Sequence, residues 1–169
     1  MTENKVTTDT KSLEIIIERV YNVPREIVWE GWTRPEYVAA WWGPDRFSLP
    51  VCEIDLQKGG VYRFVSRGQD GLEYPFTGVY LEVTKPERLV YTQIFDMEPF
   101  SSQEATVTVT FEKTEDGNTK FTSKMKFTTL EEFETAIASG MEAGAIESMD
   151  RLARLLETLI KEAEENKYV

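Results

Sequence analysis

Residues 105–127, ATVTVTFEKTEDGNTKFTSKMKF, decide the class of fold to which this chain belongs. Two runs in this stretch alternate apolar with polar side chains, and Asp116-Gly117 between them favours a tight turn. Such alternation is typical of antiparallel strands with one face on an apolar core and the other in water. The side chains expected to point inward are Ala105, Val107, Val109 and Phe111 on the first strand, and Phe121, Ser123, Met125 and Phe127 on the second.

The strand pattern continues upstream, so the sequence predicts a larger antiparallel sheet. Gly-Gly, Asp-Gly and Lys-Pro pairs separate the apolar runs, as tight turns require. Six strands are predicted in this part of the chain, near residues 47–56, 60–67, 74–84, 88–96, 103–113 and 119–127.

One more strand and two short helices are predicted before this region. Residues 13–21, LEIIIERVY, are rich in β-branched side chains and partly alternate, which indicates a strand. A proline is tolerated in the first turn of a helix, so residues 24–31 are expected to form a short helix that begins at the proline. Residues 33–36, Thr-Arg-Pro-Glu, have the form of a capping box that would open a second helix. That helix is expected to end at residues 42–44, Trp-Gly-Pro.

The chain is predicted to finish with a long amphipathic helix. Thr129 to Glu132 repeats the capping-box pattern, and apolar residues then recur every three or four positions. Gly140 and Gly144 interrupt this run, so either the helix is locally kinked or it begins only after Gly140. The apolar stripe consists of Phe133, Ile137, Met141, Ala145, Met149, Leu152, Leu156 and Leu159.

This order of elements predicts an α+β fold, with a curved antiparallel sheet of about seven strands and a long C-terminal helix. The helix can bury its stripe only against the concave face of the sheet, with the two short helices closing one end. A cavity between sheet and helix follows from this geometry. We predict a single domain over residues 13–160, a disordered leader at 1–12, and a frayed tail at 161–169.

Composition excludes several classes of function. The chain has 169 residues, of which 19 are Lys or Arg and 30 are Asp or Glu, for a net charge of −11. Such a charge disfavours binding to nucleic acid or to an anionic membrane. Histidine is absent, which removes His-based catalytic triads and imidazole zinc sites. The lone Cys52 rules out an intramolecular disulfide and favours a cytoplasmic location.

Several motifs in order resemble one known family. The chain is similar from about residue 13 to 158 to the activator of Hsp90 ATPase homologue 1-like (AHSA1) family, in the START-like (SRPBCC, Bet v 1-like) helix-grip superfamily. The resemblance implies a helix-grip fold that holds apolar or aromatic molecules between sheet and helix. One departure is Ala145, where family members often carry an aromatic residue. The motifs are Arg19–Pro24, Val28-Trp29, Trp32–Glu36, Trp41–Pro44, Lys58–Phe64, Phe76–Tyr80, Pro86–Leu89 and the Gly-rich start of the last helix.

The aromatic content agrees with such a ligand site. Four Trp, seven Tyr and nine Phe are present, and tyrosines inside an apolar cavity supply polar groups that can orient a ligand. Strand alternation also places Arg19 on the inward side, with Ile15 and Ile17. The residues predicted to line the cavity are Trp32, Trp42, Tyr62, Phe64, Tyr80, Tyr91, Phe111, Ile137, Met141 and Met149.

The first hypothesis is therefore the binding of a small hydrophobic or aromatic molecule of unspecified identity. A cyclase- or dehydratase-type enzyme in the same cavity is an alternative, although the sequence shows no nucleophile beside a base. The family name adds an Hsp90 co-chaperone, which is disfavoured because the eukaryotic activator has a separate N-terminal domain. No catalytic residue, metal site, cofactor or membrane span is predicted.

Overall fold

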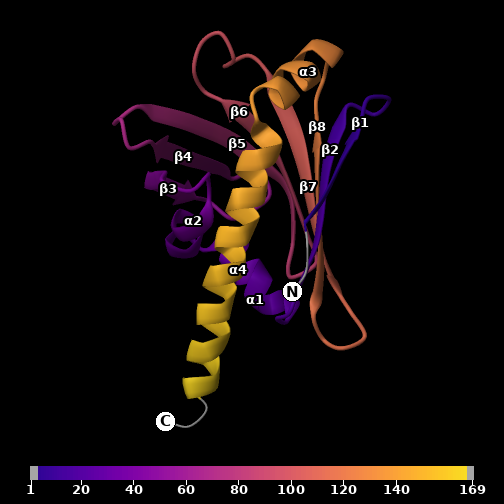
Figure 1. Ribbon diagram of the computed structural model, residues 1–169, viewed down its shortest axis with the longest axis vertical. Coiled ribbons are helices and arrows are strands. Elements are labelled where there is room, and N and C mark those ends of the chain that lie inside the picture. Colours follow the sequence, from indigo (N-terminus) through magenta and orange to yellow (C-terminus); the bar gives the residue numbers. More distant parts are fainter. Residues whose placement is uncertain (1–3, 167–169) are drawn as a thin grey trace.

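A computed structural model describes residues 4–166 (Figure 1). Eight strands form one sheet in the order β1-β2-β8-β7-β6-β5-β4-β3, and every neighbouring pair is antiparallel. The α+β fold predicted from the sequence is confirmed. The strands are β1 Lys5–Asp9, β2 Glu14–Tyr21, β3 Ser48–Ile54, β4 Val61–Arg67, β5 Glu73–Thr84, β6 Arg88–Phe95, β7 Glu104–Lys113 and β8 Thr119–Lys126. The helices are α1 Arg25–Thr33, α2 Pro35–Trp41, α3 Leu130–Ala138 and α4 Met141–Asn166.

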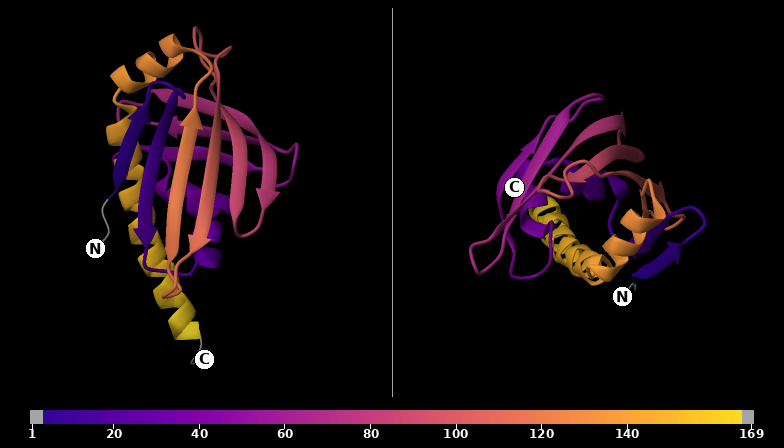
Figure 2. Two further views of the ribbon diagram at one scale, coloured as in Figure 1. Left: turned by 90° about the vertical axis from the view of Figure 1, so that its right-hand side faces the viewer. Right: turned by 90° about the horizontal axis from the view of Figure 1, so that it is seen from above.

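The hairpin of β7 and β8 has the alternation that the sequence predicts. Phe111 pairs with Phe121, and Val107 pairs with Met125, so their side chains lie on one face of the sheet. Phe111 and Phe121 are fully buried. The sheet curves around α4, which crosses its concave face (Figures 1 and 2).

The first strand corrects the prediction that residues 1–12 are disordered. Lys5–Asp9 forms β1 and pairs with β2, from Lys5 opposite Glu18 to Asp9 opposite Glu14. An edge strand forms its backbone hydrogen bonds with a single neighbour and needs little apolar surface. The polar sequence of β1 therefore gave no sign of a strand. Val6 nevertheless packs on the core. The sheet thus has eight strands rather than seven, and residues 1–3 of the predicted leader lie outside the described residues.

The two short helices form as expected, but their junction differs from the predicted capping box. α1 extends through Thr33, whose hydroxyl donates a hydrogen bond to the Trp29 carbonyl at 2.8 Å. That hydroxyl is therefore used inside α1 and does not cap α2. Arg34 occupies the N-cap position in an extended conformation, and Pro35 begins α2.

The C-terminal helix is divided at Gly140, which is one of the two arrangements left open by the sequence. Thr129 caps α3, because its hydroxyl accepts a hydrogen bond from the Glu132 amide at 3.2 Å. Gly140 has a φ of +82°, a conformation that L side chains rarely adopt, and α4 starts at the next residue. α4 remains helical through Asn166, so residues 161–166 of the predicted frayed tail are ordered helix. Residues 167–169 lie outside the described residues.

Close packing of α1 on α4 closes one end of the concave face. A Cβ added to Gly31 would lie 3.2 Å from Leu152 Cδ1 and 3.5 Å from Leu156 Cδ2. Glycine at this position lets the two helices approach closely. Leu152 and Leu156 are fully buried, as are Phe111 and Phe121 on the sheet opposite. We call this region the sealed half of the concave face.

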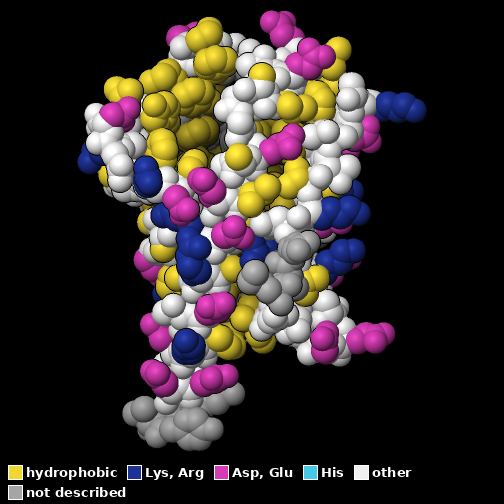
Figure 3. Space-filling model, in the orientation of Figure 1, with side chains coloured by type: hydrophobic (Ala, Val, Ile, Leu, Met, Phe, Trp, Pro, Cys, Tyr) yellow, Lys and Arg dark blue, Asp and Glu magenta, His cyan; other side chains and the backbone are white. Residues whose placement is uncertain are grey.

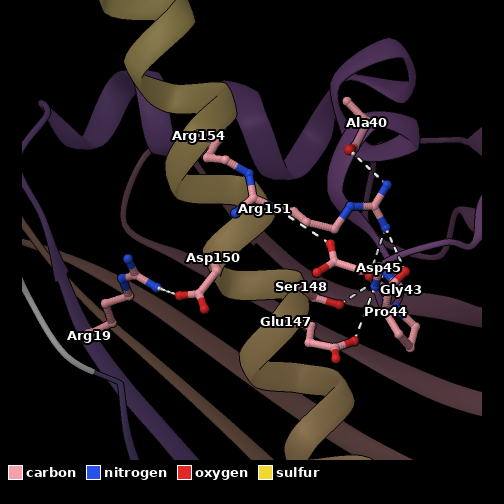
Figure 4. A network of polar contacts seen from close by, with 10 residues as sticks. All are labelled: Arg19, Ala40, Gly43, Pro44, Asp45, Glu147, Ser148, Asp150, Arg151 and Arg154. Atoms are coloured by element: carbon pink, nitrogen blue, oxygen red, sulfur yellow. Dashed lines mark hydrogen bonds and ion pairs between the residues drawn. The ribbon is translucent and has the colours of Figure 1, made fainter.

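Polar contacts hold α4 against the segment that follows α2 (Figure 4). The Arg151 guanidinium donates to the carbonyls of Gly43 at 2.9 Å, Pro44 at 3.0 Å and Ala40 at 3.1 Å. The Ser148 hydroxyl accepts from the Gly43 amide at 3.1 Å. These bonds satisfy backbone groups around the end of α2 and fix the position of the neighbouring Trp42.

Candidate functional site

A small cavity, enclosed on most but not all sides, lies between the sheet, α2 and the segment that follows it, and we call it the closed cavity to distinguish it from the open hollow beside it. Its volume is about 10 Å³, close to the minimum that holds one water molecule. All of its lining side chains are uncharged, and most are aromatic. They are Trp32, Val38, Trp41, Trp42, Tyr62, Phe64, Tyr80, Leu89 and Tyr91.

Tyr62 is locked into this cavity wall by the sheet itself. Its hydroxyl donates to the Thr92 carbonyl at 2.7 Å, across to β6. Gly78 is paired with Tyr62 in the register of β4 and β5. A Cβ on Gly78 would lie 1.9 Å from the Thr92 oxygen and 2.6 Å from the Tyr62 ring, so only glycine fits beneath the ring. The Tyr62 hydroxyl is thus already used in a hydrogen bond within the sheet.

The hydroxyls of Tyr80 and Tyr91 differ from that of Tyr62 in their hydrogen bonding. Their ring centroids are 6.1 Å apart and each lies 5.6 Å from that of Tyr62. Both side chains are buried, yet the structure shows no hydrogen bond from either hydroxyl to a residue within 4–166. Burial raises the pKa of both tyrosines well above the usual value of 10; the Cys52 thiol adds to the rise in the pKa of Tyr80, and Tyr80 adds to the rise in the pKa of Tyr91. Both therefore stay protonated and neutral at ordinary pH.

Trp32 adds a third polar group without a partner. Its indole Nε1 is buried and has no hydrogen-bond acceptor among the described residues. Trp41, which packs against it at a centroid distance of 4.7 Å, instead donates its own Nε1 hydrogen to the Gly31 carbonyl at 2.8 Å. Because a buried N–H normally finds an acceptor, Trp32 brings an unused donor to the residues that line this cavity.

Beyond the closed cavity the concave face opens into a hollow. Figure 3 shows hydrophobic side chains lining this hollow beside the first turns of α4, over β4 to β6. In the sheet register Phe76 lies opposite both Phe64 and Phe95, which places all three rings on the concave face. Five aromatic side chains of this region are half-buried, and we call them the aromatic wall. They are Trp42, Tyr74, Phe76, Phe95 and Phe100.

Ring contacts connect the aromatic wall to the closed cavity. Trp42 lies 5.3 Å from Phe64 and 4.8 Å from Phe76, measured between ring centroids. Phe76 stacks on Phe95 at 5.2 Å, and Phe95 stacks on Phe100 at 5.7 Å. Since Trp42 and Phe64 also line the closed cavity, the hollow and the cavity are adjoining parts of one site.

The first turns of α4 carry small side chains at this level. Ala145 lies four residues before Met149 and seven before Leu152, so it shares the inward face of the helix, and it packs on the core. A Cβ on the preceding Gly144 would lie 3.4 Å from Pro44. The open half of the concave face, as we call it, is thus bounded by the aromatic wall and by the turn of α4 whose inward side chain is Ala145.

The structure brings together six of the ten residues predicted to line a cavity, namely Trp32, Trp42, Tyr62, Phe64, Tyr80 and Tyr91. The other four do not line it. Phe111 is packed against Trp29 and Trp32 in the sealed half, and Met149 accepts a hydrogen bond from Tyr21. Ile137 of α3 and Met141, the first residue of α4, pack on a second apolar cluster around Phe127 and Phe133. The break at Gly140 turns α3 toward this cluster and away from the line of α4 (Figure 1).

Sequence reasoning missed part of the site. Val38, Trp41 and Leu89 line the closed cavity, and Tyr74, Phe76, Phe95 and Phe100 belong to the aromatic wall. The signal that would have found Phe76 is its spacing: it shares the strand face of Tyr80, with Gly78 between them leaving room for Tyr62. Phe100 lies in a loop, where alternation offers no signal.

Arg19 points inward, as strand alternation predicts, but it lies apart from this site. Its guanidinium forms an ion pair with Asp150 at 2.6 Å and also donates to Asn4 at 3.2 Å (Figure 4). The pair joins β2 to α4. Within residues 4–166 no group of three or more His, Cys, Asp or Glu side chains could hold a metal ion. No helix in that range is long and apolar enough to cross a membrane.

Comparison with known proteins identifies the family. The sequence matches the family model described as activator of Hsp90 ATPase homolog 1-like protein over residues 22–157. The chain belongs to this family. No curated protein matches it.

Solved structures share the fold of this AHSA1-like chain. A protein from Nitrosomonas europaea is 25% identical, with a TM-score of 0.79 over 89% of this chain and 97% of that one. A protein from Rhodobacter sphaeroides is 23% identical, with a TM-score of 0.83 and coverage of 92% and 99%. An AHSA1-like protein from Aeromonas hydrophila is 24% identical, with a TM-score of 0.68 and coverage of 86% and 93%.

Proposed function

We propose that this AHSA1-like protein binds a small hydrophobic or aromatic molecule in the open half of its concave face. The observation that carries the proposal is the aromatic wall, five rings left half-buried beside a helix segment whose inward side chain is Ala145. In the sealed half, by contrast, Leu152 and Leu156 of α4 are fully buried against the sheet and α1. A ligand that covers the wall completes this burial.

Physical chemistry favours an apolar occupant of this site. Removing apolar surface from water contributes roughly 25 cal/mol per Å², and small-molecule sites are typically concave, apolar and supplied with a few polar groups. Aromatic rings at centroid distances of 4.8–5.7 Å present both faces and edges to a flat molecule. The wall and the cavity lining contain no charged side chain, so the proposed ligand is neutral.

The other hypotheses receive no comparable support. An acid–base enzyme would require a titratable group at the cavity whose pKa lies near neutrality, whereas the tyrosines found there have raised pKa values. The Hsp90 alternative rests on the description of the family and on no residue of this structure. A cytoplasmic setting for the proposed binding protein agrees with its single, free cysteine.

Ala145 offers a direct test of the proposal. The probe is 2-acetylnaphthalene, a neutral two-ring ketone, titrated into the protein and followed by amide NMR shifts and by calorimetry. We expect binding below millimolar, with the largest shifts at the aromatic wall. Ala145→Phe places a ring in the hollow and should weaken binding about tenfold or more.

The matched control is Ala143→Phe, the same substitution two residues earlier at an exposed position of α4. This variant should bind the probe as the unaltered protein does. The proposal is wrong if the unaltered protein shows no binding below millimolar. It is also wrong if Ala145→Phe and Ala143→Phe bind equally well.

A further inference from the structure

We propose that the closed cavity recognises one neutral hydrogen-bond acceptor on the ligand, such as a ketone or aldehyde oxygen, while the apolar body of that ligand lies along the aromatic wall. The donors are the indole Nε1 of Trp32 and the hydroxyls of Tyr80 and Tyr91. This inference rests on the proposed function, and it specifies the chemical class of ligand.

The donors are grouped in one place and are otherwise unused. Trp32, Tyr80 and Tyr91 all line the same cavity, and each side chain is at least nine-tenths buried. Trp32 Nε1 is a buried donor without an acceptor. Two neighbouring donors of the same cavity lining are satisfied, because Tyr62 and Trp41 both donate to backbone carbonyls. Leaving the buried Trp32 Nε1 unpaired costs stability, which a ligand oxygen would recover.

The size of the cavity sets what can enter it. A volume of about 10 Å³ accepts roughly one water-sized group. A carbonyl oxygen has that size, whereas a ring or a carboxylate does not. The ring system of the ligand must therefore remain outside, where Trp42 and Phe64 join the cavity to the aromatic wall.

The charge of the cavity sets the chemical character of the acceptor. None of the nine lining residues carries a charge, so a charged group would be buried without a counter-ion, at a large desolvation cost. An N–H group and two protonated hydroxyls can all donate hydrogen bonds. Together they favour a neutral oxygen that accepts.

A pair of probes of the same shape tests this inference. One is 2-acetylnaphthalene, and the other is 2-isopropenylnaphthalene, in which a CH₂ group replaces the carbonyl oxygen. We expect the ketone to bind about tenfold more tightly to the unaltered protein. Its carbonyl stretching band should move to lower wavenumber on binding.

Substitutions of the proposed donors test which side chains bind the ligand oxygen. The double substitution Tyr80→Phe with Tyr91→Phe removes only the two hydroxyl oxygens, so the ring packing remains and the protein is expected to fold. In this variant the preference for the ketone and the infrared shift should be largely lost, and Trp32→Phe should reduce both. The matched control is Tyr21→Phe, a buried tyrosine outside the cavity whose hydroxyl contacts Met149. It should keep the full preference.

The possible outcomes separate the two proposals. If both probes bind equally well, or if the ketone preference survives in the double variant, the acceptor inference is overturned and the proposed function stands. If neither probe binds the unaltered protein below millimolar, the proposed function fails and the inference that rests on it fails as well.

Discussion

The two halves of the concave face differ although the same helix crosses both. In the sealed half, Leu152 and Leu156 of α4 meet Phe111 and Phe121 of the sheet, and all four side chains are at most 1% exposed. In the open half, the inward face of α4 presents Ala145, and the rings of the aromatic wall stay half-buried. The size of the side chains along one helix face therefore decides where the sheet is covered and where it remains accessible.

This difference also separates the part of the concave face that stabilises the fold from the part where we propose that a ligand binds. The sealed half receives additional cover from α1, whose Gly31 approaches Leu152 and Leu156 closely, so its contribution to folding should be large. The open half lacks such cover, which leaves its apolar surface available to another molecule. A protein that packed both halves equally well would be more stable and would have no place for a ligand.

Removing one side chain from each half should give the largest contrast. Leu152→Ala leaves a cavity in a fully buried site and should lower the free energy of unfolding by about 2–5 kcal/mol. Phe100→Ala removes a half-buried ring whose main aromatic contact is Phe95 and should cost about 1 kcal/mol. Urea denaturation of both variants measures the two values.

Equal losses of stability in those two variants would contradict the division into halves. A conservative variant, Leu152→Met, serves as the control in the sealed half, since it nearly preserves the volume and should cost less than about 1.5 kcal/mol.

The sequence was most informative where one period governs a long run of residues. The β7–β8 hairpin, in which β7 alternates threonines with apolar residues and β8 alternates lysine or threonine with mostly apolar residues, has the predicted strands and inward faces. β1 was missed because an edge strand is held by backbone hydrogen bonds to β2, which polar side chains do not reveal. The predicted capping box at Thr33 was wrong, because a capping-box pattern does not show whether the preceding helix has already ended.

The site was predictable only in part, for a related reason. Alternation identified the inward tyrosines of β4, β5 and β6, because each lies on a regular strand. It could not show that the break at Gly140 directs Ile137 and Met141 toward a second apolar cluster. Nor could it show which hydroxyls are used by the fold, since the bond from Tyr62 to Thr92 depends on a register that three strands set together.

The next contrast is between the tyrosine pKa values of the folded protein and those of the unfolded chain, and it affects stability at alkaline pH. Burial raises the pKa of Tyr21, Tyr80 and Tyr91 in the folded protein, whereas in the unfolded chain tyrosine ionises near pH 10. Above that pH the unfolded state loses protons that the folded state keeps, so stability should fall as pH rises. Each tyrosine contributes up to about 1.4 kcal/mol per pH unit.

The measurement is the free energy of unfolding between pH 9 and 11. The double variant Tyr80→Phe with Tyr91→Phe should show a shallower decline than the unaltered protein, because two of the groups that ionise on unfolding are gone. An identical slope in both proteins would show that these hydroxyls are not shielded from water in the folded state.

The smallest expected effect distinguishes two tyrosines that line the same cavity. Tyr62→Phe removes the donor to the buried Thr92 carbonyl and should cost about 1 kcal/mol, because that oxygen is left without its partner. Tyr91→Phe removes a hydroxyl for which residues 4–166 supply no partner and should change stability by less than about 0.5 kcal/mol. Denaturant titration at neutral pH, where neither hydroxyl ionises, gives both values. If Tyr91→Phe costs as much as Tyr62→Phe, the Tyr91 hydroxyl already has a hydrogen-bond partner in the free protein and is not an unused donor in the closed cavity.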